Sequence, residues 1–83
     1  MNYKIKGIIV GIGELKTTKT GIGVRQLHFE QEMNGRIFYP SALGSKTELL
    51  NDFYPGDVAE VEFHINGSKG TYNNVIIDSI ARI

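Results

Sequence analysis

The sequence predicts an all-β domain, a five-stranded barrel with one short helix between its third and fourth strands. Three observations predict it. Segments rich in β-branched and aromatic residues recur along the 83 residues, glycine-containing turn signals separate them, and one segment has a helical pattern. Cysteine is absent, so no disulfide reinforces the fold, and most apolar side chains of so short a chain must serve its core.

The first predicted strand covers residues 3–15 and is unusually long. It is rich in isoleucine, which favours a strand, while Gly7, Gly11 and Gly13 interrupt it and disfavour a helix. Glycine inside a strand marks a bulge or a sharp bend. We therefore expect one strand that curves between two halves of a sheet, followed by a polar loop at residues 16–23.

Residues 24–32 alternate between two faces, which is typical of a half-buried strand. Leu27 and Phe29 fall on the face that we expect to point inward. Asn34 and Gly35 then form the pair that is favoured in a type I′ hairpin turn, because both residues tolerate positive φ.

The third predicted strand, residues 36–40, leads into the one helical segment, residues 41–52. Ser45 and Glu48 have the spacing of a capping box at the start of a helix. The leucines that follow form a narrow apolar stripe, so we expect a short helix there.

Two more strands complete the prediction. After the turn at residues 55–57, residues 58–65 alternate with the clearest strand period in the chain. A glycine-rich hairpin loop spans residues 66–70, and residues 72–83 form the last strand.

The resulting order is three strands, a helix and two strands, with a long bent first strand. This is the element order of the OB-fold, a partly open barrel of five strands. An SH3-like barrel would not place a helix between its third and fourth strands, and a β-grasp would need a longer helix after only two. The prediction is one OB-fold domain over residues 1–83.

The net charge does not imply a generic basic nucleic-acid binder. Nine basic and nine acidic residues cancel, so the net field does not steer the protein toward polyanions. Along the chain, residues 1–25 hold five basic residues and one acidic one, whereas residues 48–62 hold five acidic residues and no lysine or arginine. Two interpretations remain open, a molecule with one basic and one acidic face, and an ordinary solvated surface.

The sequence also bears on location. No apolar run approaches the ~20 residues that cross a bilayer, and the start of the chain lacks the apolar core of an export signal. The absence of cysteine fits a reducing compartment. We therefore expect a cytoplasmic protein without a membrane partner.

Several short motifs do not support a catalytic or cofactor site. Residues 11–13 begin like a dinucleotide fingerprint, but lysine replaces the third glycine and no helix follows. In the two segments that resemble a P-loop, residues 44–47 and 67–70, lysine follows serine instead of glycine. His28 and His64 are the only histidines, too few for a typical zinc site. We expect a non-enzyme without metal or cofactor.

The expected barrel offers a track for single-stranded nucleic acid. OB-folds hold the strand in a groove beside their loops, and bases stack on aromatic side chains of the second and third strands. The sequence supplies cations for phosphates and rings for bases on these segments, with His28 as an auxiliary ring. The candidate binding residues are the cations Lys16, Lys19, Arg25, Arg36 and Lys69 and the rings Phe38, Tyr39 and Tyr72.

Four short segments carry a family resemblance. They are Lys6-Gly7-Ile8-Ile9, Gln26-Leu27-His28-Phe29-Glu30, Tyr54-Pro55-Gly56-Asp57-Val58 and Ile80-Ala81-Arg82-Ile83. With them, nearly the whole chain resembles a family of small bacterial OB-fold proteins, related to single-stranded DNA-binding proteins and known chiefly from Bacteroidetes. Leu43 and Ala81 stand where the family pattern has tryptophan, which removes two stacking rings.

The leading hypothesis is an OB domain that binds single-stranded nucleic acid, DNA in preference to RNA, as an accessory to replication, recombination or repair proteins. The alternative is a protein-interaction or assembly module that offers a strand edge or the acidic strand at residues 57–64 to a partner. A barrel that binds small molecules or oligosaccharides is third. Exposed barrel strands offer an edge for pairing, so a homodimer or larger assembly is expected.

Overall fold

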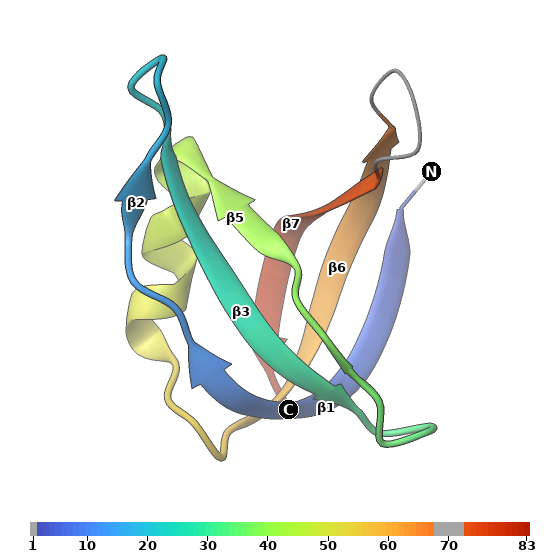
Figure 1. The fold of residues 1–83 in the computed structure, drawn as a ribbon. Helices are drawn as coiled ribbons and strands as arrows, with labels where there is room; N and C mark the ends of the chain where they lie inside the picture. The colour runs from blue at the N-terminus through green and yellow to red at the C-terminus, as the bar shows by residue number, and fades with distance from the viewer. Residues whose placement is uncertain (1, 68–72) are drawn as a thin grey trace.

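The computed structural model describes residues 2–67 and 73–83 (Figure 1). It is mainly β with one helix, as predicted. No helix in the described part of the chain is long and apolar enough to cross a membrane. The elements are β1 (Tyr3–Ile12), β2 (Lys16–Thr17), β3 (Gly23–Gln31), β4 (Ile37–Phe38), β5 (Ser41–Leu43), the 3-10 helix η1 (Gly44–Asp52), β6 (Val58–Gly67) and β7 (Asn73–Arg82).

The strands close into a barrel (Figure 1). Hydrogen-bonded neighbours follow the order β1-β6-β7-β5-β3-β2, and β1 also pairs with β3, which joins distant parts of the sheet. The link between β5 and β7 is parallel, with Ser41 opposite Ile76. β2 continues the first predicted strand beyond residue 15, and β5 continues the third beyond residue 40. With these short extensions counted as parts of the first and third strands, the five-stranded OB-fold barrel is confirmed.

β1 turns the corner between two parts of the sheet. Its first half pairs with β6 and its second half with β3, and Gly7 takes part in both pairings. The register with β3 shifts between Ile9 and Gly11, which is a bulge of the kind that bends a strand. The prediction of one long strand with a bend is therefore confirmed, and β2 continues it.

The two loops beside β3 differ from the prediction. β2 pairs with the first residues of β3, so the loop predicted at residues 16–23 is confined to residues 18–22. Beyond the other end of β3, Gly35 has a φ of 67° but Asn34 does not have positive φ, so the type I′ turn is wrong. Instead, the Gly35 N–H donates to the Gln31 carbonyl oxygen (2.9 Å), and the Asn34 Oδ1 accepts a backbone N–H (2.9 Å). The Asn34 side chain closes this longer loop.

η1 forms where a helix was predicted, but it begins at Gly44, before the predicted N-cap Ser45. Leu43 precedes it with extended backbone (φ −118°, ψ 144°), and no side chain of the described residues caps this end. Gly44, with a φ of 59°, allows the abrupt change from β5 to the helix. The predicted capping box is wrong because Ser45 lies inside the helix.

The barrel interior is filled by residues of β1, β3, β5, β6 and β7, together with Leu50 of η1 and Phe53 directly after it. Leu27 and Phe29, which the alternation predicted to point inward, are fully buried. Because these residues point inward, their neighbours on β3 must face outward. The buried apolar residues are Ile9, Leu27, Phe29, Ala42, Leu50, Phe53, Ala59, Val61, Phe63 and Ile77.

Candidate nucleic-acid interface

The outer face of β3 carries Val24, Gln26 and His28, two residues apart on the same side of the strand. The strands on either side extend this face. Residues directly opposite each other in antiparallel strands share a face of the sheet. Lys16 and Leu43 lie opposite Val24, Ser41 lies opposite Gln26, and Gly11 lies opposite His28.

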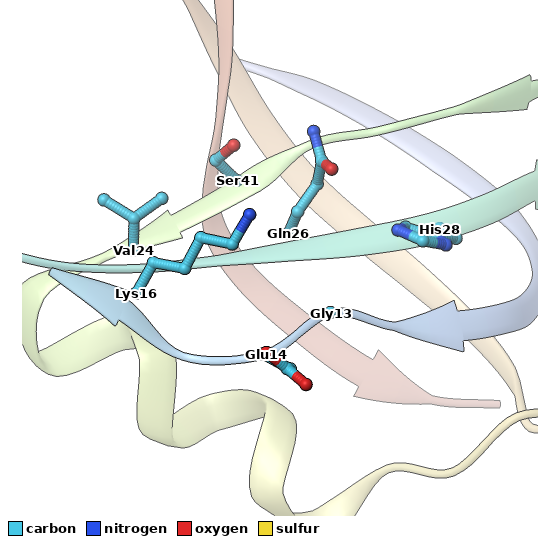
Figure 2. Close-up of a pocket in the computed structure, with 7 residues that line it drawn as sticks. All are labelled: Gly13, Glu14, Lys16, Val24, Gln26, His28 and Ser41. Carbon is cyan, nitrogen blue, oxygen red and sulfur yellow. The ribbon is translucent and has the colours of Figure 1, made fainter.

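A groove of about 430 Å³ crosses this outer face. It spans β2, β3 and β5, so three strands contribute side chains to it (Figure 2). The residues that line it are Gly13, Glu14, Lys16, Val24, Gln26, His28 and Ser41.

Three polar side chains extend over the same side of the sheet in this groove. Figure 2 shows Lys16, Gln26 and Ser41 rising from β2, β3 and β5, with the Lys16 ammonium directed toward the other two. Glu14 extends away from them. None of the three side chains has a hydrogen-bond or ion-pair partner within residues 2–67 and 73–83. Together they offer an ammonium, an amide and a hydroxyl, all of which can donate to a ligand.

An aromatic pair adjoins the polar part of the groove. The rings of His28 and Tyr39 lie edge to face, with centroids 5.0 Å apart and an angle of 82° between their planes. Tyr39 is 53% exposed, although it precedes a buried proline. Such a ring can receive a flat ligand without any rearrangement of the core.

Gly11 and Gly13 leave the side of the groove next to β1 without side chains. A Cβ atom on Gly11 would lie 3.1 Å from the His28 Nδ1, and one on Gly13 would lie 3.1 Å from the Gln26 carbonyl oxygen. Bare backbone at these positions leaves the outer side of β3 accessible. Glycine is the residue expected where a ligand or another chain approaches the backbone closely.

The structure brings together part of the predicted set. Lys16 lines the groove, Tyr39 adjoins it through His28, and Lys19 lies in the loop between β2 and β3. Arg36 lies beyond the far end of β3, next to the hairpin loop. Lys69 and Tyr72 fall outside the described residues.

Arg25 and Phe38 are engaged elsewhere. The Arg25 Nε donates to the Gly13 carbonyl oxygen (2.9 Å), and its Nη1 donates to the Asn51 Oδ1 (2.9 Å), which ties β3 to η1. Phe38 faces the core, with ring centroids 5.8 Å from Phe29 and 5.7 Å from Phe63. Phe38 and Tyr39 thus point to opposite sides, as their adjacency in an extended segment requires.

Sequence reasoning missed two polar members of the groove, Gln26 and Ser41. The alternation of β3 already placed Gln26 on the same outward face as His28. Ser41 had no comparable signal, because its place beside Gln26 depends on the cross-strand register and on strand β5 replacing the predicted start of the helix.

Comparison with known proteins gives the fold but no relative by sequence. No protein-family model and no curated protein sequence matches the chain. A solved structure of the protein PriB from Ralstonia solanacearum superposes with a TM-score of 0.70 at 15% identity, covering 98% of this chain and 95% of that one. A second structure of the same protein gives 0.69 at 17% identity, covering 99% and 97%. The likeness spans nearly all of both chains and supports the OB-fold.

Proposed function

We propose that the groove over β2, β3 and β5 binds single-stranded nucleic acid, DNA in preference to RNA. The observation that carries this proposal is the combination of groups on one open face: the Lys16 ammonium, the Gln26 amide and the exposed Tyr39 ring. Their location also fits, because the second and third strands of an OB barrel form its usual surface for oligonucleotides.

The chemistry of the groove matches what a flexible polyanion with flat bases requires. A cation holds a phosphate, and an exposed ring accepts a base, which contributes ~1–3 kcal/mol per stacked base. Lys16 is the one cation among the described residues that line the groove, and Lys19 lies in the adjoining loop. With so few cations we expect a modest affinity, suited to an accessory role in replication, recombination or repair.

The test is a titration with fluorescent dT and mixed-sequence oligonucleotides at low and moderate salt. Changing both Lys16 and Lys19 to Glu should lower affinity by roughly tenfold or more, since hydrogen bonds to charged groups contribute ~1.5–3 kcal/mol. The logarithm of the binding constant should fall with the logarithm of the salt concentration, with a slope of roughly −0.7 per phosphate contacted.

Lys4→Glu is the matched control, because Lys4 is also exposed but lies on the part of β1 that pairs with β6. It should leave affinity nearly unchanged. If the protein binds no oligonucleotide at tens of micromolar, or binds with no salt dependence, the proposal fails.

A second candidate, an assembly module, is favoured by one observation on the outer face of the barrel. Ile8 lies opposite both Val58 and Glu30, and Glu30 lies opposite Ile37. The three apolar side chains are 40–47% exposed, so they form an interrupted apolar row across four strands. Such a row suits contact with another protein or a second copy of the chain. A titration without binding would favour this candidate.

A further inference from the structure

We propose that the groove contains a subsite for a single nucleotide, with one phosphate on Lys16, Gln26 and Ser41 and its base against the His28–Tyr39 pair. This inference rests on the proposed function and deepens it, because it assigns each half of the groove to one chemical part of the ligand. The nucleotide is either free or a unit of a longer strand.

The phosphate half is built by cross-strand register. Gln26 and Ser41 are direct partners on β3 and β5, whose Cβ atoms in such a pair lie ~4.5–5.5 Å apart. Lys16 is opposite Val24 and is therefore the diagonal neighbour of Gln26, within reach of its long side chain. One cationic and two neutral donors thus converge without partners of their own among the described residues, which is the donor set that a phosphate accepts.

The base half lies one step along the same strand. The His28 and Tyr39 rings meet edge to face, and Gly11, which lies beside the His28 ring, adds no side chain that would cover it. A base can stack here by its π-face, and stacking of this kind tolerates every base. We therefore expect little discrimination among the four bases.

The spacing of the two halves fits one nucleotide. Gln26 and His28 are two residues apart on one face of β3, so their backbones are separated by ~7 Å along the strand. A phosphate and the base of the same nucleotide are joined through one sugar and need a separation of this order. Gly13 lies beside Gln26 and has no side chain, so it leaves room for that sugar.

Three small probes separate the halves by NMR titration of the full, isotope-labelled chain: inorganic phosphate, thymidine and thymidine 5′-monophosphate. Phosphate is expected to shift the Gln26 side-chain amide, and thymidine the His28 and Tyr39 ring signals. Thymidine 5′-monophosphate is expected to shift both sets and to bind about tenfold more tightly than either fragment, since it gains a charge-assisted contact over thymidine.

Variants assign the residues. Ser41→Ala and Gln26→Leu are expected to weaken thymidine 5′-monophosphate severalfold and to leave thymidine unchanged, whereas Tyr39→Leu weakens both. Ser45→Ala on η1 and the exposed Tyr54→Leu are the matched controls and should change neither affinity. Thermal melts verify that each variant remains folded.

The outcomes distinguish this inference from the proposed function. If oligonucleotides bind but thymidine 5′-monophosphate binds no better than thymidine, or Ser41→Ala and Gln26→Leu weaken both equally, the two-part subsite is overturned and the proposed function stands. If neither oligonucleotides nor nucleotides bind, both are overturned. Shifts at the three phosphate residues that disappear in Ser41→Ala would support the subsite.

Discussion

The Asp57 carboxylate links the turn after η1 to the last strand, β7. The Tyr54 backbone N–H donates to the Asp57 Oδ2 at 2.9 Å, and the Arg82 Nη2 donates to the same oxygen at 3.0 Å. The Arg82 guanidinium also donates to the Asp52 carbonyl oxygen and lies over the Phe53 ring. The hydrogen bond from Tyr54, and then the one from Arg82, hold the pKa of Asp57 below its ordinary value of 3.8.

A carboxyl whose pKa is lowered by folding stabilises the fold above its unfolded pKa, and this contribution is lost as the pH falls through the folded pKa. We therefore expect Asp57→Asn to lower the melting temperature at pH 7, and the difference from the native chain to shrink as the pH falls below 3.8. Thermal melts from pH 7 to pH 2.5 measure it. Asp52→Asn is the control, because Arg82 contacts only the backbone of that residue among the described contacts. A difference that is constant with pH would contradict this account.

At the scale of elements, β1 depends on a close approach to β3. A Cβ atom on Gly7 would lie 2.1 Å from the Glu30 carbonyl oxygen and 2.8 Å from the Phe29 ring. Since the nearest atom belongs to the backbone of a paired strand, Gly7→Ala should force the two strands apart and lower the free energy of unfolding by roughly 1–3 kcal/mol. Urea unfolding measures the loss. In Gly11→Ala the nearest atoms belong to the His28 side chain, which can turn away, so equal losses in the two variants would contradict the prediction.

Some elements of the barrel could be predicted from the sequence, and others could not. Alternation predicted β3 and β6 because an inner and an outer face impose a strict period, and the glycines of residues 7–13 predicted the bend because few other residues permit it. The Asn34 turn and the start of η1 could not be predicted in this way. The turn depends on local hydrogen bonds of the Asn34 side chain and the Gly35 backbone, and the start of the helix depends on Gly44, which ends strand β5. Such local hydrogen bonds compete with regular secondary structure and are not visible in the hydrophobic pattern.

At the scale of the whole molecule, pairing between strands brings some of the basic residues of the first part of the chain against acidic residues of β6. Lys4 lies opposite Glu62 and Lys6 opposite Glu60, so the basic first strand lies against the acidic β6. Pairing of opposite charges across strands stabilises a sheet modestly. Only the register reveals this mixing. The same holds for the groove, because β3 and β5 meet at Gln26 through a register that neither segment encodes alone.

The barrel closes between β5 and β7 through little strand pairing. We call this junction the seam, and it adjoins the groove. Within the described residues, β5 joins β7 by the single bridge between Ser41 and Ile76, while β6 and β7 pair along nearly their whole length. The nearby contact from the Lys46 Nζ to the Asp78 carbonyl oxygen (3.0 Å) links η1 to β7 at the surface. Elements with few paired neighbours open at lower free energy than the central ladder.

Native-state hydrogen exchange should therefore be faster at the amides of residues 41–43 than at those of residues 59–63. Because Ser41 belongs both to the seam and to the groove, a bound oligonucleotide should slow exchange in β5, while β6, on another part of the barrel, keeps its rate. Exchange followed by NMR with and without oligonucleotide measures both effects. Equal protection of β5 and β6 in the free protein would mean that the seam is not the weak point. Slowing confined to β6 on binding would place the ligand on a different face of the barrel.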